Sequence, residues 1–301
     1  MLRPLSISFE FFPPKTQEGM VMLSHSAERL SFTHPHFFSV TFGAGGSTRD
    51  GTLETVKKLQ QHLSVSVAPH LACIGETRSQ LIEILQQYQS CGVKRVVALR
   101  GDLPSGMGSG FGDFRYAYEL VEFIREVTGN YFHIEVAAYP EFHPQAQNAR
   151  QDIINLKNKY EAGANSAITQ YFFNPDAYFY FLDDCAKYGI SLPIVPGIMP
   201  ITQFNKLVRF SNMCGAEIPK WIYQRLHSYG DDTKSVLALG REIIVTLCEK
   251  LISGGAPGLH FYTLNKADVT LQILQDLKLS RQYIHEKSMV SSFEKEGLGG
   301  I

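Results

Sequence analysis

Short apolar runs alternate with amphipathic stretches along most of the chain. In the amphipathic stretches, apolar residues recur at i, i+3, i+4 and i+7, as at Leu81, Ile84, Leu85 and Tyr88, which places them on one face of a helix. The apolar runs have the length of strands and occupy residues 5–12, 37–42, 65–71, 95–99, 133–138, 166–172, 192–198 and 259–263. The pattern therefore predicts alternating strands and helices.

Several of the runs are apolar almost throughout, which is typical of strands in a parallel sheet covered on both faces. They recur about every thirty residues, the length of a strand–helix–strand unit. Eight such runs predict an α/β fold, the (β/α)8 or TIM barrel, with extra helices at 218–227 and 234–253 between strands 7 and 8. A doubly wound open sheet is the alternative, but no G-x-G-x-x-G follows the first run.

Length and composition limit the possible classes of protein. The 301 residues suit two domains or one large barrel, and the strand count assigns 1–279 to a single barrel and 280–301 to a flexible polar tail. A net charge of -1 argues against nucleic acid or an anionic membrane surface as partner. No apolar run has the roughly 20 residues of a transmembrane helix. Five scattered cysteines without C-x-x-C indicate reduced thiols, so we expect a cytoplasmic protein.

Polar residues gather where the apolar runs end. In a (β/α)8 barrel the carboxyl ends of the strands form the mouth that holds the active site. The residues expected there are Glu10, Thr41, His70, Arg100, Asp102, Tyr139, His143 and Gln170.

Two carboxylates are candidate catalytic groups. Glu10 lies between Phe9 and Phe11, where burial would raise its pKa and suit a general acid. An ion pair with a Lys or Arg across the barrel explains Glu10 equally well. Asp102 is a candidate acid, a loop cap or a partner for Arg100. The spacing of the histidines and cysteines resembles no metal site, and we expect no metal.

Two segments have features of phosphate sites. The Gly-rich loop 43–48 could hold a phosphate, although a tight turn is the simpler interpretation. Asp152, Asn155 and Lys159 fall on one helical face at i, i+3 and i+7 near the expected helix start. Such a set could hold a ribose and a phosphate, but a solvated polar face would give the same pattern.

The motifs SFEFFPPK, VTFGAGGSTRD, APHLACIG, ALRGDLP, VAAYPEFHP, AGANSAITQYFF, PGIMPIT and HFYTLNKA, in this order, resemble the methylenetetrahydrofolate reductase family over about residues 5–279. The resemblance implies a catalytic barrel with FAD at its mouth and NADH or NADPH as hydride donor. It also implies ping-pong reduction of 5,10-methylenetetrahydrofolate to 5-methyltetrahydrofolate, which supplies methyl groups for methionine synthesis. Family members are commonly homo-oligomers, and we prefer NADH by analogy with bacterial members.

The resemblance also implies a role for each matching residue. Glu10 would be the general acid, and Asp102 would contact both pterin and flavin and stabilise a cationic folate. The implied FAD contacts are Thr41, Phe42, Ala44, His70, Leu99, Arg100, Gly101, Asp102, Tyr139, His143, Asp152, Asn155 and Lys159. The implied folate or nicotinamide contacts are Asp102, Gln170, Phe210 and Lys266.

Several positions depart from the family pattern. Phe42, Asn158, Lys206 and Lys266 stand where some members have Tyr, Arg, Gln and Arg, so contacts to the cofactor and the folate would differ there. A Lys cannot reproduce the bidentate carboxylate contact of an Arg. The alternatives are another barrel enzyme that needs no flavin and a pterin- or flavin-binding protein without reductase activity.

Overall fold

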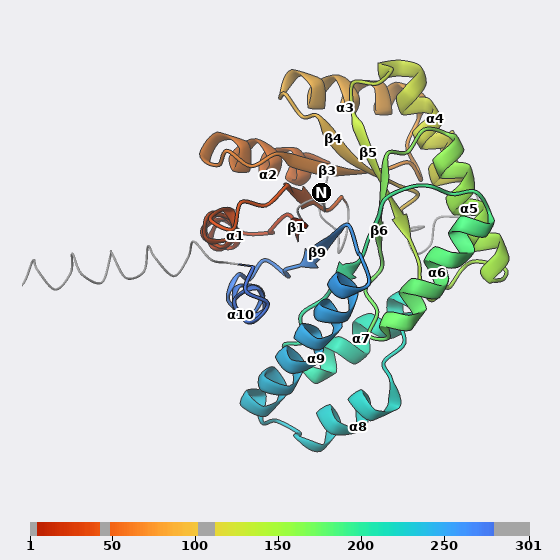
Figure 1. The fold of residues 1–301 in the computed structure, drawn as a ribbon. Coiled ribbons are helices and arrows are strands. Elements are labelled where there is room, and N and C mark those ends of the chain that lie inside the picture. Colours follow the sequence, from red (N-terminus) through yellow and green to blue (C-terminus); the bar gives the residue numbers. More distant parts are fainter. Residues whose placement is uncertain (1–4, 43–48, 102–111, 280–301) are drawn as a thin grey trace, which may run out of the picture.

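Strands and helices alternate around a nearly closed parallel barrel in the computed structural model, which describes residues 5–42, 49–101 and 112–279 (Figure 1). The strands are β1 (Ser6–Phe11), β2 (Phe37–Val40), β3 (Val67–Ala72), β4 (Arg95–Leu99), β5 (His133–Ala138), β6 (Ser166–Thr169), β7 (Ile194–Val195), β8 (Gly197–Ile198) and β9 (Gly258–Tyr262). The strand order is β7-β6-β5-β4-β3-β2-β1-β9-β8, with every pairing parallel. The predicted TIM-barrel class is confirmed.

Helices surround the barrel (Figure 1). They are α1 (Gln17–Ser31), α2 (Arg49–His62), α3 (Arg78–Ser90), α4 (Ala117–Thr128), α5 (Ala149–Glu161), α6 (Pro175–Lys187), α7 (Phe204–Cys214), α8 (Lys220–Ser228), α9 (Thr233–Ser253) and α10 (Asp268–Asp276). Within the described segments, none of these helices combines the length and apolar character needed to cross a membrane.

The alternation of side chains along each strand divides the core into two parts. Successive strand residues point to opposite faces of a sheet, so one set faces the helices and the other faces the barrel axis. A large apolar cluster that includes Phe9 and Phe261 packs with residues of the surrounding helices. A small separate cluster of Phe37, Ala68, Val97 and Ile168 forms an apolar layer inside the barrel. The interior is thus packed, and the polar groups of the mouth have an apolar floor.

The seventh strand differs from its prediction. The single strand expected over 192–198 is two short strands, β7 and β8, separated by Pro196. Proline has no N–H to donate to a ladder. β7 pairs with β6, and β8 pairs with β9 on the other side. Across the break, the Gly197 amide donates to Thr169 Oγ1 at 2.8 Å instead of continuing the β6–β7 ladder.

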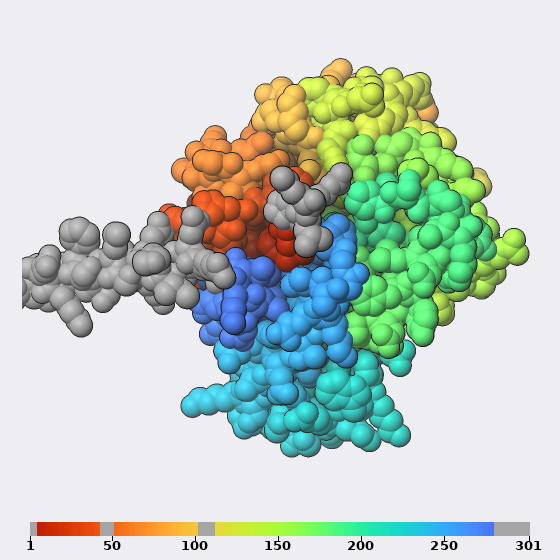
Figure 2. All heavy atoms as spheres, in the orientation of Figure 1, coloured from red at the N-terminus to blue at the C-terminus, as the bar shows by residue number. Residues whose placement is uncertain are grey.

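The segment between the seventh and eighth strands contains more helix than predicted. The expected helices at 218–227 and 234–253 correspond to α8 and α9, whereas α7 was not predicted. Figure 2 shows these helices as a lobe at the lower edge of the molecule. Strands expected to end at residues 42 and 172 instead end at Val40 and Thr169. The polar and aromatic residues that follow these strand ends therefore lie in the loops at the mouth of the barrel.

A buried polar cluster closes the opposite, N-terminal end of the barrel. Glu135 forms an ion pair with Arg95, and its Oε1 lies 3.2 Å from His133 Nε2. Ser166 donates a hydrogen bond to the same carboxylate. Burial raises the pKa of Glu135, but these partners outweigh it and the pKa is lowered. Three of the four residues are the first residues of their strands, so the cluster lies at the end of the barrel away from the mouth. We therefore interpret it as a cluster that stabilises the fold.

Candidate active site

The carboxyl ends of the strands bring most of the predicted site residues to one end of the barrel. Glu10 and His70 lie within β1 and β3, Leu99 ends β4, and Thr41, Phe42, Arg100, Gly101, Tyr139 and Gln170 directly follow β2, β4, β5 and β6. Ala44 and Asp102, together with the loop 43–48 and the tail 280–301, lie outside the described residues.

Glu10 lies between two histidines. Its Oε2 is 3.3 Å from His70 Nε2 and 3.7 Å from His260 Nε2, and its side chain is 18% exposed. His70 comes from β3 and His260 from β9, so the two rings approach the carboxylate from different strands. The alternative of an ion pair with Lys or Arg does not apply to the described residues, because both ionisable neighbours found within 4 Å of the carboxylate are imidazoles.

The pKa of Glu10 is shifted in the direction opposite to our expectation. Burial raises it, as expected, but the His260 and His70 imidazoles lower it by more, and the pKa falls to about 2. The predicted raised pKa is therefore wrong for the ligand-free protein. The sequence reasoning counted the apolar neighbours of Glu10 along β1 and missed the imidazoles that other strands bring to it.

The turn after β9 fixes the backbone around Glu10. Thr263 Oγ1 donates to the Glu10 carbonyl at 2.6 Å. The Asn265 side chain accepts from the Phe12 amide at 2.9 Å and donates to the Phe12 carbonyl at 2.8 Å. Asn265 has φ 59, a left-handed conformation that Asn tolerates better than most residues. Sequence reasoning missed Asn265, although an Asn two residues after the Thr that follows the strand was a usable signal. Lys266 follows in the same turn.

A second group of predicted residues is linked by hydrogen bonds at the ends of β4 and β5. Arg100 donates from Nη2 to the Gln145 side chain, and the Gln145 amide donates to His143 Nδ1 at 3.0 Å. The His143 amide donates to Asp152 Oδ2 at 2.9 Å, and the Tyr139 ring packs edge-on against His143 with centroids 4.6 Å apart. Gln145, which was not predicted, thus links Arg100 to His143, and His143 in turn contacts Asp152 and Tyr139.

The α5 face differs from the prediction in one respect. Asp152 lies in the first turn of α5, but Lys159 lies in the last turn, so the three residues do not cluster near the helix start. Lys159 Nζ donates to the Ala137 carbonyl of β5, and Asn155 accepts a hydrogen bond from Gln151. Burial lowers the pKa of Lys159 to about 8, with Asp152 opposing the shift. Lys159 is therefore a buried amine directed at the barrel wall.

The remaining candidates lie around the other side of the mouth. The Gln170 amide donates to the Ala138 carbonyl at 2.8 Å, while its own side-chain oxygen accepts from the Tyr171 amide. Tyr171 Oη lies 3.1 Å from Ser211 Oγ, which brings α7 next to Gln170. Phe210, the neighbour of Ser211, is half-buried against the core. The structure shows no hydrogen bond or ion pair joining Phe210 or Lys266 side chains to Glu10 among the described residues.

The mouth fits a polar, anionic, partly aromatic cofactor such as a flavin nucleotide. Thr41 Oγ1 and His70 Nε2 are buried and make no hydrogen bond with the described residues, although His70 Nε2 lies 3.3 Å from Glu10 Oε2. Buried polar atoms are rarely left unpaired, so a ligand is expected to satisfy them. A diphosphate needs positive charge, and Arg100 and Lys159 are cations among the predicted residues on this side of the barrel. Gly101 has φ +87, and a Cβ there would meet Ala72 at 3.0 Å, so only glycine suits this turn.

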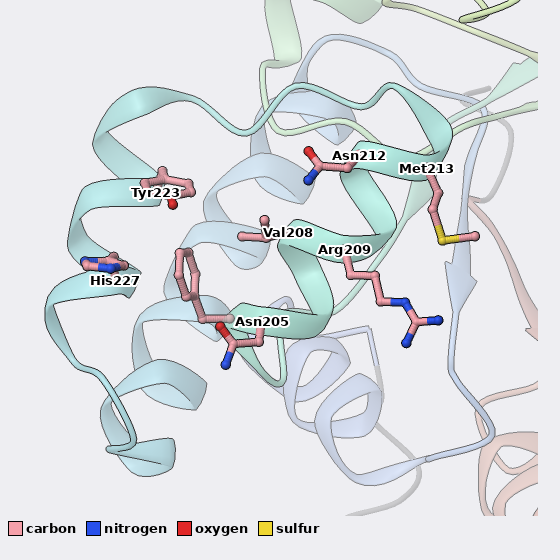
Figure 3. Close-up of a pocket in the computed structure, with 8 residues that line it drawn as sticks. Asn205, Val208, Arg209, Asn212, Met213, Tyr223 and His227 are labelled. Atoms are coloured by element: carbon pink, nitrogen blue, oxygen red, sulfur yellow. The ribbon is translucent and has the colours of Figure 1, made fainter.

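A separate cavity of about 600 Å³ lies between α7 and α8 (Figure 3). Tyr223 and His227 stack with centroids 5.9 Å apart and point toward α7, whereas Arg209 and Met213 point away from α8. None of the predicted site residues lines this cavity. Across the described part of the chain, no group of three His, Cys, Asp or Glu residues could hold a metal ion.

Comparisons with known proteins agree on one family. The family model described as methylenetetrahydrofolate reductase matches residues 3–278. The 5,10-methylenetetrahydrofolate reductase of Escherichia coli is 41% identical over 273 residues, covering 91% of this chain and 90% of that protein. A rice protein named probable methylenetetrahydrofolate reductase (NADH) is 39% identical, covering 90% of this chain and 48% of its own length.

A solved structure shares the fold at lower sequence similarity. It is an uncharacterized Clostridium thermocellum protein whose description says that it binds two copies of 5-methyl-5,6,7,8-tetrahydrofolic acid. It has a TM-score of 0.68 and 17% identity, covering 92% of this chain and 96% of that one. At this identity the likeness supports the barrel fold alone.

Proposed function

The chain belongs to the methylenetetrahydrofolate reductase family, and we propose that it reduces 5,10-methylenetetrahydrofolate to 5-methyltetrahydrofolate with FAD and a nicotinamide dinucleotide. The two half-reactions would follow a ping-pong order at one site. The rice relative is named for NADH, which supports NADH over NADPH as the donor. That the enzyme is cytoplasmic and homo-oligomeric stays a prediction.

The observation that carries the proposal is the chemistry of the mouth. The carboxylate of Glu10 lies 3.3 Å from His70 Nε2, and neither this buried nitrogen nor the buried Thr41 Oγ1 makes a hydrogen bond with the described residues. Two cations lie at neighbouring strands. Arg100 directly follows β4 and donates to Gln145, and Lys159 donates to the Ala137 carbonyl of β5. An acid for the substrate and a polar, positively charged cradle for the cofactor are the two parts that this reaction needs.

Glu10 is proposed to move one proton in each cycle. As the five-membered ring of the folate opens, one C–N bond breaks and its electron pair stays on nitrogen. The Glu10 carboxyl donates its proton to that nitrogen, and the carbon becomes an iminium carbon that receives hydride. Water returns a proton to Glu10, so each cycle consumes one hydride and one proton.

Glu10 must acquire this proton in the covered site. The two imidazoles hold its pKa at about 2, which keeps it ionised at neutral pH. A ligand over the mouth would remove the remaining solvent from a side chain that is 18% exposed. Desolvation raises the pKa of a carboxyl group. We therefore propose that substrate binding itself brings Glu10 into its acid form.

The other predicted residues would bind and orient. Flavin chemistry supplies hydride transfer between nicotinamide and folate. The Gln170 amide would hydrogen-bond the pterin and the nicotinamide, Phe210 would pack on either ring, and Lys266 would pair with a carboxylate of the glutamate tail. Asp102, outside the described residues, would stabilise the cationic iminium through its negative charge.

The purified protein should be yellow and should cycle between two flavin states. Anaerobic NADH should bleach the oxidised flavin absorbance, and methylenetetrahydrofolate should then restore it without oxygen. NADPH in place of NADH tests the donor preference. A colourless protein that takes up no FAD contradicts the proposal and favours a barrel enzyme without flavin. Bleaching without recovery by the folate favours a flavoprotein of another reaction.

Replacing Lys159 by Ala should weaken FAD retention by about tenfold or more. A charge-assisted hydrogen bond contributes about 1.5–3 kcal/mol, and each 1.4 kcal/mol is a factor of ten in affinity. Because the amine has a pKa of about 8, the difference between wild type and variant should be largest below pH 8 and shrink as the pH rises through it. FAD release on dilution, followed by flavin fluorescence, measures the effect.

The matched control is Lys157→Ala on the same helix. Lys157 forms an exposed ion pair with Glu161 at 3.6 Å, so its removal takes away a cation without touching the barrel wall. FAD retention should match wild type in this variant. Equal FAD dissociation in Lys159→Ala and wild type would remove Lys159 from the cofactor site.

A further inference from the structure

A fully buried histidine, His260, lies one layer below Glu10 in the barrel. In the β1–β9 register Ser8 pairs with His260 and Glu10 pairs with Tyr262. The His260 side chain is completely buried, and its ring stacks on Phe37 with centroids 5.8 Å apart. The ring therefore has little freedom to rotate. The family resemblance assigned no role to this residue.

The hydrogen bonds of His260 define its tautomer. Its Nδ1 lies 2.7 Å from Ser8 Oγ, and its Nε2 faces Ser39 Oγ at 3.5 Å and Glu10 Oε2 at 3.7 Å. A carboxylate can only accept, so the nitrogen that faces it must carry the proton. Nδ1 then accepts from the Ser8 hydroxyl. This arrangement directs an Nε2–H toward Glu10.

Both imidazoles approach the same oxygen of Glu10. His70 and His260 each contact Oε2, at 3.3 and 3.7 Å. Because both rings lie next to Oε2, we infer that the other oxygen, Oε1, is the one that exchanges a proton with a substrate. The groups that face Glu10 from the elements packed against it are His70 of β3, Ser39 of β2, and His260 and Tyr262 of β9.

We propose that His260 is a positioning residue for Glu10: its Nε2–H, set by Ser8, holds Oε2 so that Oε1 carries the proton delivered to the folate nitrogen. The inference rests on the proposed function, because it names the oxygen that performs the proton transfer described above. His260 touches neither folate nor cofactor in this scheme. It acts only through the carboxylate.

A purely structural role accounts less well for this side chain. Its ring stacks on Phe37, which belongs to the apolar cluster of Phe37, Ala68, Val97 and Ile168, and an apolar residue at 260 would extend that cluster. Burying a polar ring instead costs free energy, which hydrogen bonds only offset. The cost is explained if the ring orients a group whose geometry matters for the reaction.

The test compares two substitutions of His260. In His260→Asn the side-chain amide occupies the place of Nδ1 and keeps the Ser8 contact, but nothing replaces Nε2–H. In His260→Gln the longer amide carries an N–H to the place of Nε2. We expect His260→Asn to slow the folate half-reaction by about 10-fold to 100-fold, part of the usual contribution of a general acid, and to shift its pH profile. Flavin reduction by NADH should be unchanged, and His260→Gln should recover most of the lost rate.

A second readout needs no cofactor. In protein labelled with ¹³C at the glutamate carboxyl carbons, the Glu10 resonance is identified by its absence in Glu10→Gln. Its NMR titration should show a pKa raised by about one unit or more in His260→Asn, because a hydrogen bond to the ionised form is lost. His133→Asn is the matched control, since that imidazole pairs with Glu135 at the opposite end of the barrel.

The outcomes separate the two proposals. A protein without flavin or folate activity contradicts the proposed function, and the NMR titration still decides whether His260 controls Glu10. An unchanged Glu10 titration in folded His260→Asn overturns the inference. Equal slowing of both half-reactions, with no recovery in His260→Gln, also overturns it, because that result indicates a general structural defect.

Discussion

Glu10→Gln should leave reduction of the flavin by NADH intact and abolish reduction of the folate. The amide keeps the size of the side chain and can still contact the imidazoles of His70 and His260, which lie 3.3 and 3.7 Å from Oε2. It has no acidic proton to give to the folate nitrogen. General acid catalysis contributes about 10²- to 10⁴-fold, so the folate half-reaction should fall by that factor. Anaerobic stopped-flow measurement of each half-reaction separates the two effects.

Glu135→Gln provides the comparison for a buried carboxylate without a catalytic role. The Glu135 side chain is 3% exposed against 18% for Glu10, but its partners are Arg95, His133 and Ser166 at the N-terminal end. Its loss should lower stability, since breaking a buried ion pair leaves an unpaired charge. Both half-reactions should remain in the folded fraction. If Glu10→Gln slowed both half-reactions equally, Glu10 would not be the acid.

The fold could be predicted from the sequence because the barrel repeats one local pattern. Each parallel strand can be recognised from its own apolar run. Strands β4 and β5 have the predicted bounds, Arg95–Leu99 and His133–Ala138. The failures occur where pairing partners decide the outcome. Pro196 divides the seventh strand because β7 and β8 pair with different neighbours, which no local pattern shows. Helix α7 was not predicted, although extra helix was expected in the same interval.

The site was harder to predict because its chemistry depends on neighbours from distant strands. Glu10 and Glu135 both occupy apolar strands, and sequence reasoning singled out only Glu10, because it lies near the carboxyl end of its predicted strand. What distinguishes them is their place along the axis, fifth residue of β1 and third residue of β5. The lowered pKa of Glu10 and the role of His260 both depend on the pairing of β1 with β9, whose residues are about 250 positions apart in the chain.

The break at Pro196 makes Gly197 a point of large expected effect. A Cβ at position 197 would lie 2.1 Å from the Thr169 carbonyl oxygen and 2.8 Å from Tyr262 Oη. The Gly197 amide donates a hydrogen bond to the Thr169 hydroxyl at 2.8 Å. The Tyr262 hydroxyl donates to the Thr169 carbonyl at 2.6 Å. These bonds join β6, β8 and β9 where the ladder is interrupted. A methyl group there must push these strands apart.

Gly197→Ala should therefore lower the free energy of unfolding by about 3 kcal/mol or more, measured by urea denaturation followed by circular dichroism. Gly92→Ala is the matched control. Gly92 has φ +74 with open space around its Cβ, so its substitution should cost about 1 kcal/mol from backbone strain alone. Gly197 has no such strain, and its loss would come entirely from the contact with Thr169 and Tyr262. A loss at Gly197 no greater than at Gly92 would mean that β8 can shift without opening the barrel, and that the hydrogen bonds of Thr169 do not hold its closure.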